Sequence, residues 1–156
     1  MLILKPSVGI LKATNLDFKL INFILSGFFK VKWRTPIRVE KCRENWSGYW
    51  PDDKLIRIDL KQGTSLKYII STLLHEIRHI KQVKEIKGIR FDYDSYKEYY
   101  NSPEEKDARQ FEKLTTDVCV IYKSYKKIEE KYNQYNFNCF KELTYNIKNE
   151  HTKVYR

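Results

Sequence analysis

Residues 75–79 read H-E-x-x-H and lie inside a long segment with helical periodicity. Apolar residues recur there every three to four positions, which predicts an α-helix over residues 66–86. The main apolar stripe consists of Leu66, Ile69, Leu73, Ile77 and Ile80. His75 and His79 point to the other side, which is itself partly apolar. A helix with apolar residues on both sides is usually buried, so we expect this segment to lie in the interior of the protein.

The spacing of the two histidines suits one metal ion. Residues i and i+4 of a helix lie one above the other, so His75 and His79 can bind the same ion with Glu76 beside it. Zinc lowers the pKa of a bound water from ~15.7 to about 7, and Glu76 would be the general base that takes its proton. The alternative is an amphipathic helix with two solvated histidines. The chain has only 3 His, and a chance match is expected on the order of a few times per thousand chains.

Length and composition favour a single domain. The chain has 156 residues and 42% hydrophobic residues, enough for a core and too many for a disordered chain. We predict one domain over residues 1–148 and a flexible tail over residues 149–156. The cysteines, Cys42, Cys119 and Cys139, are odd in number and far apart, so no disulfide framework or thiolate zinc site is expected. The composition thus favours a reducing, cytoplasmic setting.

No segment resembles a signal peptide or a membrane span. The most apolar run, residues 20–29, is about half as long as the ~20 residues that a spanning helix needs. We therefore expect no membrane partner.

The net charge of +10 is concentrated outside the H-E-x-x-H region. Residues 1–62 carry +6, residues 63–120 are neutral overall, and residues 121–156 carry +4. Such a surface can attract nucleic acid or an acidic protein. A bias toward AT-rich codons, which enriches Lys, Ile, Tyr and Asn, explains the same composition. Any nucleic-acid binding is therefore expected to be weak and non-specific.

The remaining periodicity predicts an α+β architecture. Residues 15–30 have the pattern of an N-terminal helix, with Thr14 or Asn15 as its cap. Residues 36–41 and 54–60 alternate apolar and charged residues and are separated by turn-forming residues. We predict that they form a β-hairpin and hence a short antiparallel sheet.

A second helix is expected after residue 102. Ser102, Pro103 and Glu105 occupy the N-cap, N1 and N3 positions of a capping box. An apolar stripe continues this helix to Tyr125, and residues 140–147 have a weaker helical pattern.

A catalytic zinc needs a third protein ligand, and the sequence offers several. The segment P-E-E-K-D-A-R-Q-F, residues 103–111, resembles the P-x-E-x-E/D-A-x-x-F signature that follows H-E-x-x-H in small gluzincin-type peptidases. The ImmA/IrrE-like and related phage-encoded peptidases are the nearest groups. The resemblance implies that Glu105 is the third ligand, with Glu104, Asp107 or His151 as alternatives. It also implies a zincin-like fold in which residues 55–60 form an edge strand that pairs with extended substrate.

The resemblance covers residues 54–112 and has departures. Arg109 occupies the position where many gluzincins have an acid that orients a histidine, and Asp107 is the candidate to replace it. Arg78 is charged where zinc peptidases usually have an uncharged residue. The alternative role of Glu105 is that of a plain helix cap.

The pattern predicts a zinc metallopeptidase that hydrolyses peptide bonds of a specific protein. The resemblance suggests a target such as a DNA-bound regulator. Two alternatives are a basic binding module with little or no turnover on the same scaffold, and an enzyme that hydrolyses another kind of amide. Four tyrosines are expected in the core or in the wall of the cleft, and one could stabilise the oxyanion: Tyr93, Tyr96, Tyr99 and Tyr100.

Overall fold

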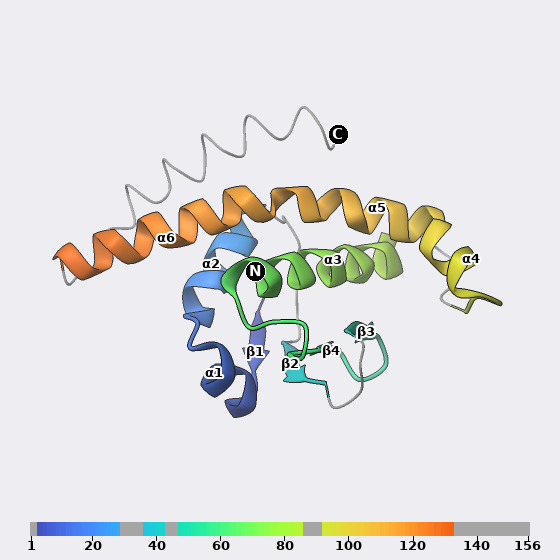
Figure 1. Ribbon diagram of the computed structural model, residues 1–156, viewed down its shortest axis with the longest axis horizontal. Coiled ribbons are helices and arrows are strands. Elements are labelled where there is room, and N and C mark those ends of the chain that lie inside the picture. The colour runs from blue at the N-terminus through green and yellow to red at the C-terminus, as the bar shows by residue number, and fades with distance from the viewer. Residues whose placement is uncertain (1–2, 29–35, 43–46, 86–91, 133–156) are drawn as a thin grey trace.

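The computed structural model describes residues 3–28, 36–42, 47–85 and 92–132, which form a mixed α+β fold (Figure 1). The four strands are β1 (Leu4–Pro6), β2 (Ile37–Lys41), β3 (Gly48–Trp50) and β4 (Leu55–Ile58). The helices are α1 (Val8–Thr14), α2 (Phe18–Phe28), α3 (Leu66–Glu85), α4 (Tyr96–Asn101), α5 (Pro103–Phe111) and α6 (Thr115–Tyr132), with a 3₁₀ turn η1 (Glu112–Leu114) before α6. The residue ranges 140–147 and 149–156 lie outside the described residues.

The sheet is mostly parallel, so the predicted hairpin of β2 and β4 is wrong. The strand order is β1-β2-β4-β3; β1, β2 and β4 run parallel, and only β3 is antiparallel to its neighbour β4. The segment expected to be a turn contains β3, which forms the real hairpin with β4. The turn between them is tight: Lys54 has a φ of 46° and its N–H donates to the carbonyl of Pro51 at 3.2 Å.

This order also contradicts the expectation that residues 55–60 form an edge strand. β4 has β2 on one side and β3 on the other. The outer side of β1 is closed by Asn22 of α2, whose side chain accepts from the N–H of Leu4 at 2.7 Å and donates to its carbonyl at 2.9 Å. Among the described strands, β3 is therefore the edge that neither a second strand nor the Asn22 amide covers.

The N-terminal helical region consists of two helices rather than one. Asn15 ends α1 in the left-handed conformation, with a φ of 52°, which asparagine tolerates better than most residues. The cap of α2 is Asp17, not Thr14 or Asn15: its carboxylate accepts from the N–H of Leu20 at 3.1 Å. α2 then packs against β1 and α6.

Helix α3 lies at the centre of the fold, as its two apolar sides predict. It contacts β3 and β4 on one side and α5, η1 and α6 on the other. Figure 1 shows it in green between the sheet and the long α5–α6 arm. Ser65 caps it by accepting from the N–H of Tyr68 at 3.2 Å. Leu73, Leu74 and Ile77 are fully buried, and each contributes about 1.5–3 kcal/mol through burial.

The expected helix after Ser102 is present but is interrupted. Ser102 is the N-cap of α5 and Pro103 is its first residue, as predicted. The helix tightens into η1, where the hydroxyl of Thr115 donates to the carbonyl of Glu112 at 2.5 Å, and then continues as α6. None of the described helices is both long enough and apolar enough to cross a membrane.

Candidate metal centre

Three side chains from two helices converge between α3 and α5. His75 and His79 lie on α3, and Glu105 lies in the first turn of α5. The Glu105 carboxylate oxygens are 3.1 Å from Nε2 of His75 and 2.8 Å from Nε2 of His79. The two Nε2 atoms are 3.0 Å apart. The expected position of the Glu105 carboxylate beside both imidazoles is thus confirmed; metal ligation itself stays a prediction.

The geometry fits a tetrahedral metal ion. Ligand atoms about 2.0–2.1 Å from a tetrahedral zinc are about 3.3 Å from one another. The two Nε2 atoms are 3.0 Å apart, and one donor atom from each of the three residues lies within 4.8 Å of the other two, so small side-chain rotations would bring all three to this spacing. A donor set of two imidazoles and one carboxylate is also the type found at catalytic zinc sites that keep a position open. The three residues therefore fit the ion that the sequence predicts.

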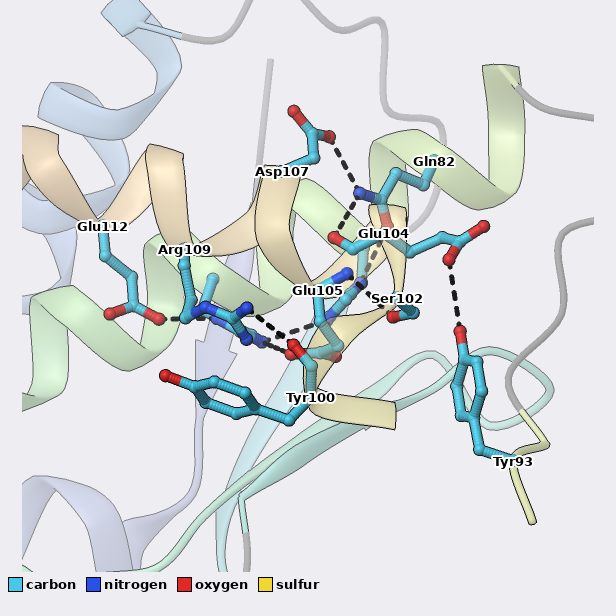
Figure 2. Close-up of polar contacts among 11 residues, drawn as sticks. Gln82, Tyr93, Tyr100, Ser102, Glu104, Glu105, Asp107, Arg109 and Glu112 are labelled. Atoms are coloured by element: carbon cyan, nitrogen blue, oxygen red, sulfur yellow. Dashed lines mark hydrogen bonds and ion pairs between the residues drawn. The ribbon is translucent and has the colours of Figure 1, made fainter. Parts of the chain in front are cut away.

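The outer nitrogen of His75 is held by Glu112. Nδ1 of His75 lies 2.6 Å from Oε1 of Glu112. An ionised carboxylate only accepts, so Nδ1 carries a proton, and Nε2 is the nitrogen left to bind a metal ion. Sequence analysis missed Glu112, which begins η1 directly after α5, seven residues or about two helical turns after Glu105, and therefore lies on the same side as Glu105 (Figure 2).

The outer nitrogen of His79 is held by Gln82, also missed from the sequence. Nδ1 of His79 lies 2.8 Å from the side-chain carbonyl oxygen of Gln82. Gln82 is one helical turn after His79 and only 1% exposed. The spacing was available in the sequence, but glutamine is a common helical residue and the spacing alone does not indicate a role.

The two roles considered for Glu105 do not compete. Ser102 accepts from the backbone N–H of Glu105 at 3.3 Å, which is one half of the capping box. The other half would need the Glu105 carboxylate at the N–H of Ser102, but that N–H donates to the carbonyl of Tyr99. The helix is therefore capped by Ser102 alone, and the Glu105 carboxylate is directed at the histidines.

The alternative ligands within the described residues have other partners. The Glu104 carboxylate accepts from the hydroxyl of Tyr93 at 3.3 Å. Asp107 accepts from Nε of Arg78 at 2.5 Å and from the side-chain amide of Gln82 at 2.8 Å. His151 lies outside the described residues. Asp107 thus acts on His79 only through Gln82, not by the direct contact expected for it.

The centre attracts positive charge. Burial alone lowers the pKa of His75, but its hydrogen bonds with Glu105 and Glu112 outweigh this and raise the pKa to about 10. The pKa of His79 is also raised: burial lowers it, but the hydrogen bond with Glu105 and the charge of Glu76 outweigh this effect. Glu105 shows the complementary effect: burial opposes ionisation, but the two histidines hold its pKa well below the usual range. Protons or a cation can supply the positive charge that these carboxylates favour.

Glu76 is buried beside this cluster. Glu76 is only 5% exposed to solvent. Burial raises the pKa of the Glu76 carboxyl, while the neighbouring His75 and His79 act in the opposite direction. A buried carboxyl whose pKa is raised suits a group that both accepts and returns a proton.

The four tyrosines are not core residues. Tyr96, Tyr99 and Tyr100 are 76%, 37% and 46% exposed, and the ring of Tyr96 contacts the rings of the other two on α4. Tyr99 is the member that reaches the site: burial, the charge of Glu105 and a hydrogen bond with it raise the pKa of its hydroxyl far above the usual value. Tyr99 lies on α4, the short helix directly before Ser102, and has a hydrogen bond with Glu105.

Comparison of the chain with protein-family models, with curated proteins and with solved structures finds no match. The resemblance to gluzincin-type peptidases therefore stays a prediction.

Proposed function

We propose that the protein is a zinc-dependent metallopeptidase with a zincin-like fold, similar to the ImmA/IrrE-like group. The observation that carries the proposal is the convergence of His75, His79 and Glu105, with both outer imidazole nitrogens already hydrogen-bonded. A cluster of this kind needs a cation or extra protons to be stable. The H-E-x-x-H pattern adds a buried carboxylate next to it.

Each residue has a distinct role in this proposal. His75, His79 and Glu105 hold the ion, which when bound supplies Lewis acidity and a source of hydroxide near neutral pH. Glu76 accepts a proton from the attacking water and returns it to the leaving amine. Tyr99, whose hydroxyl stays protonated and lies next to Glu105, is the candidate donor to the developing oxyanion.

The substrate would bind along β3 rather than β4. β3 is the antiparallel edge of the described sheet and contacts α3, which carries the histidines. An extended peptide can add to such an edge through its backbone N–H and carbonyl groups. The suggestion that the peptide belongs to a DNA-bound regulator rests on the family resemblance alone.

Metal analysis tests the proposal directly. The wild-type protein, reconstituted with zinc and freed of excess, should contain one equivalent, and Glu105→Ala should contain far less. Less than a tenth of an equivalent in the wild type would end the proposal. Cleavage of a peptide library by the wild type, with zinc-loaded Glu76→Gln as the control, then tests for turnover.

The second candidate function is a binding module without turnover on the same scaffold. It is favoured by the net charge of +10, which lies outside residues 63–120. In that case zinc would be bound but no peptide would be cleaved, and duplex or single-stranded DNA would bind with an affinity that falls steeply as salt is raised.

A further inference from the structure

Arg78, Asp107 and Gln82 form one hydrogen-bonded chain between α3 and α5. Nε of Arg78 and the amide nitrogen of Gln82 both donate to Oδ2 of Asp107. The Arg78 guanidinium also lies over the ring of Phe111, 4.7 Å from its centroid. The positive charge at position 78, which departs from the zinc-peptidase pattern, therefore belongs to the α3–α5 contact and not to the cluster itself.

The surroundings of Gln82 fix the orientation of its amide. The amide nitrogen has two neighbours that can only accept, the backbone carbonyl of Glu104 at 3.0 Å and the Asp107 carboxylate at 2.8 Å. The carbonyl oxygen must then face His79 and accept its Nδ1 proton at 2.8 Å. The opposite orientation would bring the carbonyl against two acceptors. The Glu104 carbonyl and the Asp107 carboxylate on α5 therefore determine that the Nδ1 atom of His79 carries a proton.

We propose that Gln82 is a positioning residue that couples the two helices of the metal centre; the inference rests on the proposed function. Its carbonyl orients His79, a ligand from α3. Its amide nitrogen binds the peptide carbonyl of Glu104, which directly precedes Glu105, the ligand from α5. One neutral side chain thus fixes a ligand on each helix. Asp107 accepts from the Gln82 amide (Figure 2) and is itself held by Arg78.

A carboxylate at position 82 could orient His79 but could not make the other contacts. It would have no N–H for the Glu104 carbonyl and would face the Asp107 carboxylate. Only a side chain with both an acceptor and two donors satisfies all three neighbours. Gln82 is also 1% exposed, so water cannot replace a lost partner without opening the helix contact.

The test compares Gln82→Met with Ile80→Met. Methionine has nearly the length of glutamine but neither the donor nor the acceptor. Ile80 is 1% exposed on the same helix, so Ile80→Met perturbs the packing to a similar degree without touching the chain of hydrogen bonds. Competition with a chelator should show zinc affinity about 10–100-fold weaker in Gln82→Met and close to wild type in Ile80→Met. Equal affinity in all three proteins would overturn the proposal.

Nitrogen NMR of the imidazoles supplies a readout that packing alone does not move. In the zinc-loaded wild type, His79 should carry a hydrogen-bonded Nδ1 proton that exchanges slowly. Gln82→Met should lose the slow exchange, whereas Ile80→Met should keep it. If Gln82→Met does not fold, the wild-type spectrum decides: a His79 without a protected Nδ1 proton overturns the proposal.

The NMR measurement also separates failure of the inference from failure of the proposed function. If the wild type binds no zinc, the peptidase proposal falls, but the metal-free protein still tests the coupling. A protected Nδ1 proton on His79 that disappears in Gln82→Met would then support the positioning role. A proton that is absent from the wild type, or unchanged in the variant, would refute it.

Discussion

Replacing Glu105 with glutamine should separate metal binding from helix capping. Gln has the same shape and leaves the Ser102 cap intact, because that bond uses the backbone N–H of residue 105. It removes the negative charge that lies 3.1 and 2.8 Å from the two imidazoles. We expect zinc to bind at least about 100-fold more weakly, since losing even an outer hydrogen-bond partner costs 10–100-fold.

The loss of zinc affinity can be measured as the difference in thermal unfolding with and without zinc. Free zinc at 100 times the wild-type Kd stabilises the folded wild type by about 2.7 kcal/mol. A variant with a 100-fold higher Kd gains only about 0.4 kcal/mol at the same zinc concentration. For a chain of 156 residues, the unfolding entropy is about 0.33 kcal/mol/K. The zinc-induced rise in Tm should therefore be about 8 °C for the wild type and about 1 °C for Glu105→Gln.

The comparison uses the shift on adding zinc, because Glu105→Gln also changes the stability of the metal-free protein. Glu104→Gln is the matched control: it makes the same substitution one residue earlier, where the carboxylate accepts from Tyr93 instead. It should keep the full zinc-induced shift. A full shift in Glu105→Gln would refute its role as a ligand, and loss of the shift in Glu104→Gln would point to Glu104 in its place.

Three further outcomes are expected. Glu76→Gln should bind zinc as the wild type does and cleave a substrate found by library screening at least ~10²-fold more slowly; wild-type turnover would show that Glu76 is not the base. Leu73→Ala, at a fully buried position of α3, should lower the free energy of unfolding in urea by about 2–5 kcal/mol, whereas Val120→Ala, at a position 50% exposed, should change it by less than about 0.5 kcal/mol. DNA titrations should show weak binding that is lost as salt rises; sequence-selective binding at high salt would favour the binding module.

The parts of the fold that depend on local chemistry could be predicted. The periodicity of α3 and its two apolar sides placed it in the interior, and the Ser102-Pro103 pair predicted the start of α5. The choice of Glu105 came from the resemblance to the gluzincin signature, because the capping box alone would have left Glu105 as a plain helix cap. These features are set by neighbours a few residues apart in the sequence.

The direction of the strands could not be predicted in the same way. Alternation in residues 37–41 and 55–58 is the same whether the strands are parallel or antiparallel. The outcome depends on where the chain between them crosses, and there three residues, Gly48–Trp50, form a strand of their own. Three-residue strands such as β3 and β1 are too short for a clear periodic signal.

The supporting residues of the metal centre were missed for a related reason. Gln82 and Glu112 acquire their roles only when α3 and α5 lie against each other, so their identities carry no signal along one helix. Arg78 looked like a departure from the pattern because its partner, Asp107, lies 29 residues away on the other helix.

The hydrogen-bonded chain from Arg78 to His79 also has an evolutionary consequence. Substituting any one of Arg78, Asp107 and Gln82 leaves the other two with an unmatched charge or a buried amide, so the three positions should change together rather than singly. Distant relatives can then be recognised by correlated substitutions at these three positions, even where the residues themselves differ. A lineage in which position 82 has become apolar while Asp107 remains should also have lost the pair of histidines.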